Sequence, residues 1–245
     1  MISIPSSHPR AESLRIRELL VDGFTRGLVA KEGIIAHGRG EAFDYLLGEH
    51  TTEMAANAIK AAASALVHAK RPVLSINGNV AALCARDLVE LSLVIGASLE
   101  VNLFYRTPER EVAIRTELEK HGARNVLGVG PSASATIQEL HGERRRVDPR
   151  GIFSADLVFV PLEDGDRTEA LVKLGKFVIT VDLNPLSRTA KAAQISIVDN
   201  IVRALPKLVE EARLSKLHTL DESWRRFDNR SNLDASLRLL RGGAR

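Results

Sequence analysis

The chain has 245 residues, of which 44% are hydrophobic, 27% charged and 4% aromatic, with a formal net charge of +3. This length suits one large α/β domain or two small ones, and the weak positive charge suits an anionic small molecule as well as nucleic acid. A single cysteine, Cys84, excludes an internal disulfide and a cysteine-based zinc site, and favours a reducing, cytoplasmic compartment.

The first 70 residues predict two helices separated by an irregular connector. Pro9 begins an amphipathic pattern that runs to Gly27, and Thr51 opens an alanine-rich helix that ends near Ala69. Between them, the glycine-rich segment 33–45 is interpreted as a connector without regular structure. No apolar run approaches the ~20 residues of a membrane-spanning helix, and the start leads into a charged helix and not into a signal region.

From Pro72 onward, short apolar runs alternate with helical patterns. Continuous Val, Ile, Leu and Phe runs are typical of strands buried on both faces of a parallel sheet. Six such strands predict one Rossmann-like, doubly wound, mainly parallel α/β sheet after an N-terminal helical segment. We expect a single domain over residues 1–214 and a charged, helical tail over residues 215–245. The expected strands are Val73–Ile76, Leu99–Leu103, Asn125–Val129, Asp156–Pro161, Phe177–Val181 and Ile195–Val198.

Polar side chains follow the last three predicted strands at the point where each strand ends. Glu163 and Asp164 follow one strand, the segment Asp182–Thr189 follows the next, and Asp199–Asn200 follows the third. A parallel sheet binds its ligand in the crevice beyond the carboxyl ends of its strands. These carboxylates, amides and Arg-Thr pairs therefore predict a site for an anionic, hydrogen-bonding ligand such as a nucleotide.

Two glycine motifs are weak matches to the dinucleotide-binding fingerprint. Gly38–Phe43 has Phe in place of the third glycine, and neither it nor Gly128–Ala133 is followed at the right distance by a strand ending in an acidic residue. A P-loop motif is absent from the sequence. The glycines flanking Arg39 still predict a close backbone approach to an anion or to a neighbouring carboxylate.

Several other polar residues are open to two interpretations. His37 is either a base or phosphate donor, or a hydrogen-bonding fixture beside a glycine turn. Asp164 and Asp166 either bind Mg²⁺ or form a turn and cap the next helix. Asp182 directly follows a strand, where a carboxylate commonly binds ribose or metal-bound phosphate.

The remaining arginines form two groups. Arg106 and Arg110 are four residues apart at a helix start, where such a pair can hold a phosphate. The run Arg144–Arg146 and Arg150 is interpreted as a solvated surface loop, because nucleic-acid binding requires aromatic stacking partners that are scarce in this chain.

Five segments together resemble one known family, the archaeal phosphopantothenate synthetases, also called 4-phosphopantoate–β-alanine ligases. The similarity runs from Ile4 to about Glu211, and the tail beyond Leu214 lies outside it. The segments that carry it are Ile35–Leu46, Ser75–Leu83, Val101–Thr107, Val160–Val172 and Asp182–Ala190.

The resemblance implies an enzyme of coenzyme A biosynthesis. Members of this family join 4-phosphopantoate to β-alanine with ATP through an acyl-adenylate, releasing AMP and pyrophosphate. We therefore expect ATP as co-substrate with Mg²⁺, a Rossmann-like fold and a homodimer that binds neither nucleic acid nor membrane. Adenylation brings two anions together, and arginines and Mg²⁺ hold such anions without repulsion.

The same resemblance places ligand contacts on particular residues. Arg39 and Arg188 are expected at the triphosphate, with His37 as a further catalytic candidate. The expected nucleotide-binding residues are Arg17, Arg39, Asp182, Leu183, Asn184, Arg188, Thr189, Asp199, Asn200 and Ile201. On weaker grounds, phosphopantoate and β-alanine are assigned to Asn77, Asn79, Asn102 and Arg106, together with His37.

Two rival functions fit the same sequence. One is another nucleotide-dependent enzyme on this sheet, such as a kinase or a dehydrogenase, and it would release ADP or NADH instead of AMP. The other is a nucleic-acid-binding module that uses the basic loop Arg144–Arg150, whose binding would weaken steeply with salt.

Overall fold

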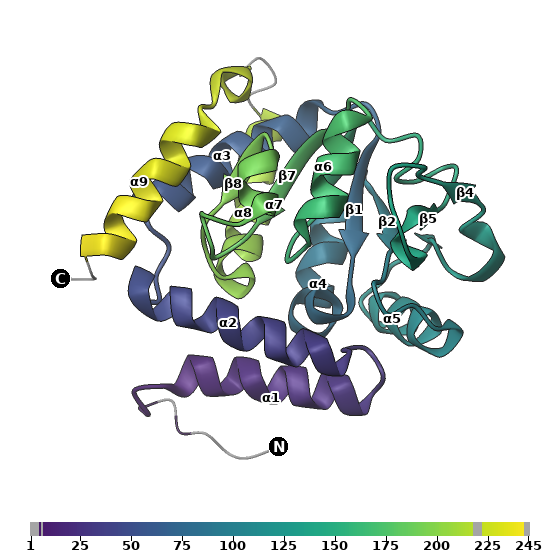
Figure 1. Cartoon of the computed structure of the whole chain (residues 1–245), viewed down its shortest axis with the longest axis horizontal. Coiled ribbons are helices and arrows are strands. Elements are labelled where there is room, and N and C mark those ends of the chain that lie inside the picture. Colours follow the sequence, from purple (N-terminus) through teal and green to yellow (C-terminus); the bar gives the residue numbers. More distant parts are fainter. Residues whose placement is uncertain (1–4, 6, 218–221, 243–245) are drawn as a thin grey trace.

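A six-stranded parallel sheet forms the centre of the protein (Figure 1). The computed structural model describes residue 5, residues 7–217 and residues 222–242. The strand order β3-β2-β1-β6-β7-β8 reproduces the Rossmann order, which confirms the predicted fold class. The strands are β1 Pro72–Ile76, β2 Ser98–Val101, β3 Val126–Leu127, β6 Leu157–Phe159, β7 Phe177–Val181 and β8 Ile195–Ile197.

Helices cover both faces of this sheet because its side chains alternate between two apolar clusters. Leu74 and Ile76 pack on one face, toward α3, α4, α5 and α8, whereas Val73 and Val158 pack on the other, toward α6. None of the described helices is long and apolar enough to cross a membrane. The helices that cover the two faces of the sheet are α3 Glu53–His68, α4 Gly78–Ile95, α5 Pro108–Lys120, α6 Gly165–Lys173, α7 Arg188–Ala192 and α8 Ile201–Leu217.

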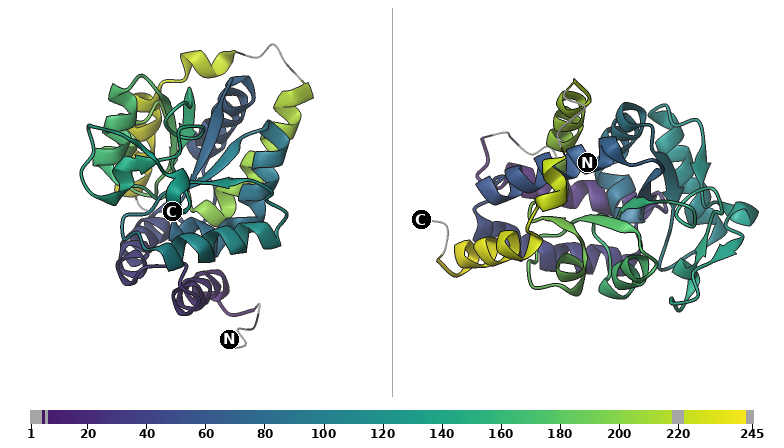
Figure 2. Two further views of the ribbon diagram at one scale, coloured as in Figure 1. Left: turned by 90° about the vertical axis from the view of Figure 1, so that its right-hand side faces the viewer. Right: turned by 90° about the horizontal axis from the view of Figure 1, so that it is seen from above.

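The C-terminal helix α9, Asn229–Gly242, lies along the β8 edge of the sheet (Figure 2). The Asn232 amide donates to the Ser196 carbonyl of β8 at 2.9 Å, and Leu233 joins a small apolar cluster with Leu47. At the opposite end, the short strands β4 Ala135–Thr136 and β5 Arg146–Val147 form an antiparallel pair. The segment that the sequence assigns to the tail thus contributes a helix to the body of the fold.

Two N-terminal helices, α1 Ala11–Thr25 and α2 Lys31–Leu47, lie across the carboxyl ends of the strands (Figure 1). The prediction of an irregular connector over 33–45 is therefore wrong. The sequence pattern does not predict helix α2, because this helix buries only Asp44 and Leu47 and has almost no apolar periodicity. Tertiary contacts, and Gly48 at the left-handed C-cap with φ of 86°, define it instead.

A matched pair of substitutions tests this helix. Gly38 is inside α2 with no atom within 4 Å of an added Cβ, so Gly38→Ala should raise the free energy of unfolding by about 0.5–1 kcal/mol. A Cβ on Gly33, in the same helix, would overlap Asn79 Oδ1, so Gly33→Ala should lower it by about 1 kcal/mol or more. Urea denaturation measures both, and equal destabilisation by the two changes would contradict the helix.

Candidate functional site

Two adjoining cavities lie beneath α2, at the carboxyl ends of the strands. The β2-side cavity, of about 260 Å³, lies at the ends of β1, β2 and β6, and the β7-side cavity, of about 340 Å³, at the ends of β6, β7 and β8. Together they fall in the range of roughly 300–1,000 Å³ typical of small-molecule sites. The residues that line both, here called the junction, are Ala36, Arg39, Asn79, Leu162, Glu163 and Asp164.

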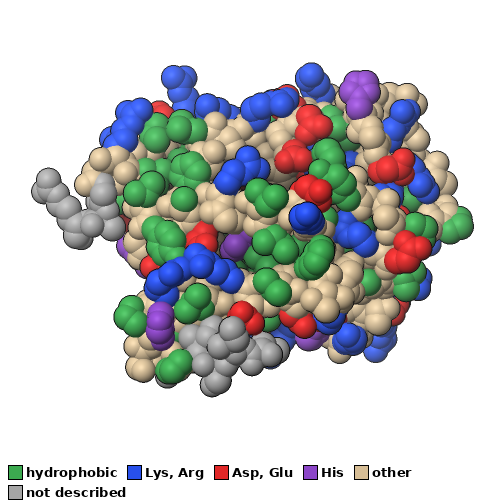
Figure 3. All heavy atoms as spheres, turned by 60° about the horizontal axis from the view of Figure 1, so that its bottom comes forward, with side chains coloured by type: hydrophobic (Ala, Val, Ile, Leu, Met, Phe, Trp, Pro, Cys, Tyr) green, Lys and Arg blue, Asp and Glu red, His purple; other side chains and the backbone are tan. Residues whose placement is uncertain are grey.

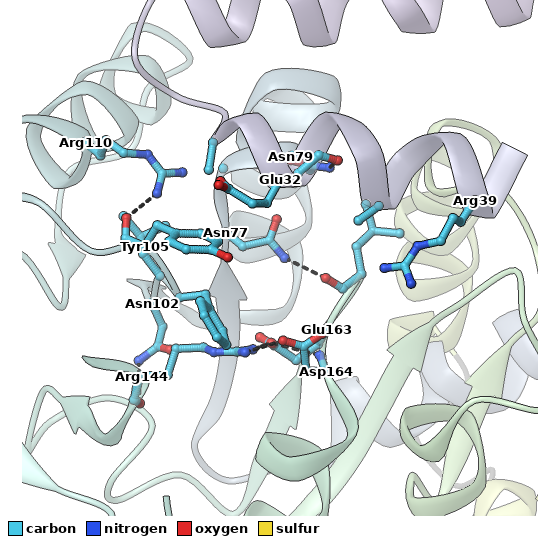
Figure 4. A pocket seen from close by; sticks show the side chains of 17 residues that line it. Glu32, Arg39, Asn77, Asn79, Asn102, Tyr105, Arg110, Arg144, Glu163 and Asp164 are labelled. Carbon is cyan, nitrogen blue, oxygen red and sulfur yellow. Dashed lines mark hydrogen bonds and ion pairs between the residues drawn. The ribbon is translucent and has the colours of Figure 1, made fainter. Parts of the chain in front are cut away.

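The β2-side cavity contains the N-terminus of α4 (Figure 4). Asn77 caps this helix, since its Oδ1 accepts from the Val80 amide at 3.1 Å. Glycine is required at position 78, where a Cβ would overlap the Leu28 carbonyl and come within 2.7 Å of the Arg110 guanidinium. Arg110 itself donates to that carbonyl at 2.8 Å. A helix N-terminus beside an arginine is a site suited to an anion.

Asn102 lies fully buried at the end of β2, where it lines the β2-side cavity. Its Nδ2 donates to the carbonyls of Arg144 at 3.2 Å and Arg146 at 3.1 Å, while its Oδ1 has no hydrogen-bond partner in the part of the chain that the structure describes. Arg106 lines neither cavity. Its Nε lies 2.5 Å from Glu111 Oε1, and it donates to the Gly128 carbonyl at 2.7 Å, so it fastens neighbouring strand ends together.

Asp182 and Asn184 follow β7 and line the β7-side cavity. The Asp182 carboxylate accepts from the backbone N–H of Asn184 at 2.9 Å and from the Ser187 hydroxyl at 2.5 Å. Burial raises the pKa of Asp182, and these two hydrogen bonds oppose the rise. The loop is therefore ordered by its own side chains before a ligand enters.

Asn200 reaches the β7-side cavity at the start of α8 and is held by a buried ionic group. Its Nδ2 donates to Asp44 Oδ2 at 2.7 Å. Arg203 binds the same Asp44 at 2.5 Å and Asp199 at 2.8 Å, and Asp199 accepts from Thr51 at 2.7 Å. Arg203 was not predicted from the sequence, although Asp199, four residues earlier and just before the start of α8, was a usable signal.

Arg39 and His37 project from α2 at the junction and the β7-side cavity, respectively. Arg39 is exposed and makes no hydrogen bond or ion pair with the described residues. In Figure 4 it hangs from the helix on the side of Glu163 and Asp164. Burial lowers the pKa of His37, despite the opposing charges of Glu41 and Asp44, which favours a neutral imidazole.

The loop after β6 has a strained backbone, and hydrogen bonds and ion pairs hold it in place at the junction. Leu162 has φ of 53°, a left-handed conformation that is rare for a bulky side chain. The Asn77 amide holds this conformation by donating to the carbonyls of Pro161 at 3.0 Å and Leu162 at 3.1 Å. Strain of this kind clusters at functional sites, and here it aims Glu163 and Asp164 into the cleft.

Two arginines form ion pairs with the Glu163 carboxylate. Fully buried Arg167 donates to its Oε2 at 2.5 Å and to the Ser75 hydroxyl at 3.0 Å, and burial lowers the pKa of Arg167 to about 10. Arg144 binds Glu163 Oε1 and Asp164 Oδ2, and its guanidinium stacks over the Phe104 ring, 4.4 Å from the centroid.

The prediction that Arg144–Arg146 forms a solvated loop is thus wrong for Arg144. It lies in a single 3-10 turn, Glu143–Arg145, that brings its side chain under the junction with 6% exposure. The ion pairs span about twenty residues of sequence, so spacing alone gave no signal. Arg150 pairs instead with the adjacent Asp148 at 2.9 Å.

The two cavities gather most of the predicted site residues. His37, Arg39, Asp182, Leu183, Asn184, Asn200 and Ile201 line the β7-side cavity, and Asn77, Asn79 and Asn102 line the β2-side cavity. The other predicted residues line neither cavity and are engaged elsewhere: Arg17 by Glu41, Arg188 by Glu169, Thr189 by the Glu163 carbonyl, Asp199 by Arg203, and Arg106 by Glu111.

Metal ligands are sparse at this site. Within the described ranges, no group of three or more His, Cys, Asp or Glu side chains is arranged to hold a metal ion. Figure 3 shows basic and acidic side chains interspersed on the face that carries α1 and α2. A divalent cation here would take most of its ligands from a bound polyphosphate.

The strand order and the ligand-sized cleft at its point of reversal define a Rossmann-like protein with a site of small-molecule size beyond the carboxyl ends of its strands. Residues 54–242 match the model of the phosphopantothenate/pantothenate synthetase family. The chain belongs to this family, as its sequence motifs predicted. The match continues past residue 214 into α9, so the expectation that the C-terminal segment lies outside the similarity is wrong.

Relatives of known name share about half of their residues with this chain. The 4-phosphopantoate–β-alanine ligase of Thermococcus kodakarensis is 55% identical over 91% of this chain and 85% of its own length. The ligase of the same name from Thermococcus onnurineus is 53% identical over 96% and 90%. That of Methanosarcina mazei is 49% identical over 97% and 94%.

The Arg144 ion pairs can be tested by their effect on stability. Arg144→Met should lower the free energy of unfolding by about 2–3 kcal/mol, because it leaves Glu163 buried with one cation instead of two. Arg145→Met, at the neighbouring half-buried position with no such pair among the described residues, should change it by less than about 0.5 kcal/mol. Denaturation of both variants measures these changes in the free energy of unfolding, and equal changes would mean that Arg144 is solvated.

Proposed function

We propose that this protein is a 4-phosphopantoate–β-alanine ligase that consumes ATP and releases AMP and pyrophosphate. The observation that carries the proposal is the family match over residues 54–242, joined to a cleft with two cavities that meet at charged residues. An acyl-adenylate reaction needs two anionic substrates held side by side, and two adjoining cavities suit that need.

ATP is assigned to the β7-side cavity. Asp182 and Asn184 lie beside the amide end of α8, so this cavity offers acceptors for ribose hydroxyls and donors for a phosphate. Arg188, which is 66% exposed and paired with Glu169, and exposed Arg17 are assigned to the outer phosphates. Thr189 and Asp199 do not line this cavity, and they are assigned a supporting role behind it. Mg²⁺ enters with ATP, held chiefly by phosphate oxygens.

4-Phosphopantoate is assigned to the β2-side cavity. The N-terminus of α4 and the Arg110 guanidinium receive its phosphate, and its carboxylate points toward the junction. Asn102 Oδ1, a buried acceptor without a partner among the described residues, suits the substrate hydroxyl. This phosphate site favours phosphorylated over unphosphorylated pantoate. Arg39 then lies where the carboxylate meets the α-phosphate, and His37 beside it. A homodimer remains part of the proposal.

The reaction itself is tested by product analysis. Both 4-phosphopantoate and β-alanine should be needed for steady release of AMP, while phosphopantoate alone should support exchange of labelled pyrophosphate into ATP. Unphosphorylated pantoate should react at least 100-fold more slowly, since it leaves the phosphate site unpaired. Release of ADP, or equal use of pantoate, contradicts the assignment.

Arg39 offers a test in which stability and activity separate. Because it is exposed and has no partner among the described residues, Arg39→Ala should leave the melting temperature unchanged and lower kcat/KM at least 100-fold. Arg39→Lys should recover only part of the loss, since an ammonium lacks the planar fork of the guanidinium.

Lys31→Ala is the matched control for Arg39. Lys31 is also an exposed cation on α2, but it lines neither cavity. Its removal should therefore leave kcat/KM within about twofold. A similar loss in both variants would assign the effect to the charge of the helix and not to Arg39.

A further inference from the structure

Asp164 occupies a helix-cap position without capping the helix. It is the N-cap residue of α6, yet its carboxylate accepts no hydrogen bond from the first turn. A capping Asp typically stabilises a helix by about 1 kcal/mol, and that stabilisation is absent here. Instead, Arg144 binds Oδ2 and turns the carboxylate toward the junction, where Asp164 lines both cavities.

Three carboxylates line the β2-side cavity, and they differ in what they can offer a ligand. Both Glu163 oxygens are engaged by Arg144 and Arg167. Glu32 lines only the β2-side cavity and does not reach the junction. Asp164 has a side chain that is 61% exposed, and its Oδ1 makes no hydrogen bond with the described residues. It is the carboxylate with a free oxygen at the junction.

We infer, on the basis of the proposed function, that Asp164 binds the ammonium group of β-alanine and accepts its proton. The neutral amine then attacks the acyl carbon of the phosphopantoyl-adenylate, a C–N bond forms, and the C–O bond to AMP breaks. The second amine proton leaves with a phosphate oxygen of AMP, and exposed Asp164 returns its own proton to solvent. Arg144 keeps the carboxylate in place during these steps.

The two half-reactions separate this role from binding of Mg²⁺. Asp164→Asn should lower kcat/KM for β-alanine about 100-fold or more, in line with the usual effect of a general base. Phosphopantoate-dependent pyrophosphate exchange, which precedes the amine step, should stay within about threefold of the unmodified enzyme. Hydroxylamine, which is uncharged at neutral pH, should still trap the adenylate as a hydroxamate at a nearly normal rate.

Asp166→Asn is the matched control, since Asp166 is an exposed carboxylate two residues away that lines neither cavity. It should retain the full rate with β-alanine. Loss of pyrophosphate exchange in Asp164→Asn would overturn the inference in favour of a metal or ATP role, and so would an unchanged rate with β-alanine. Failure of exchange in the unmodified enzyme would instead refute the proposed ligase function.

Discussion

The reversal of strand order between β1 and β6 is the constraint on which the whole site depends. The helix after β1 packs on one face of the sheet, and the helix after β6 packs on the other. The two chain segments therefore diverge at the carboxyl ends of these strands and leave a crevice. Asn77 bridges that divergence, with its oxygen on α4 and its amide on the loop after β6.

Charge at the bottom of the crevice is almost fully compensated before any ligand binds. Arg144 and Arg167 face Glu163 and Asp164, so two cations meet two anions in a group of which only Asp164 is exposed. Isolated burial of Arg144, Arg167 or Glu163 would be strongly unfavourable, whereas the group as a whole is tolerable and rigid. Such rigidity suits the proposed reaction, in which two anionic substrates are held in a fixed relation.

The sheet was predictable from sequence because its strands are continuous apolar runs that have no other stable location. Phe177–Val181 was predicted with the observed ends, and Thr52 caps the alanine-rich helix α3 in the predicted region. Helix α2 was not predicted because contacts with other elements fix its position. The Asn79 side chain donates to the Gly33 carbonyl, and Arg203 forms an ion pair with Asp44. The polar residues at the strand ends predicted the position of the cleft. The ion pairs across the cleft depend on loop geometry, which the spacing of residues in the sequence does not determine.

The structure also explains why Thr189 and Asp199, two of the predicted nucleotide-binding residues, do not line the cleft. Thr189 donates to the Glu163 carbonyl and Asp199 binds Arg203, whereas Asp182 lines the β7-side cavity with its carboxylate held by the Ser187 hydroxyl and the Asn184 backbone N–H. These contacts fix the loop shape, so the groups left free at the junction are few. Among the described residues at the junction, the Arg39 guanidinium and Asp164 Oδ1 are such groups, of opposite charge, and each residue lines both cavities. In the proposed reaction, an adenylate-forming amide ligase requires a cation where its two anionic substrates meet and a carboxylate where the amine arrives, and these two residues offer those charges.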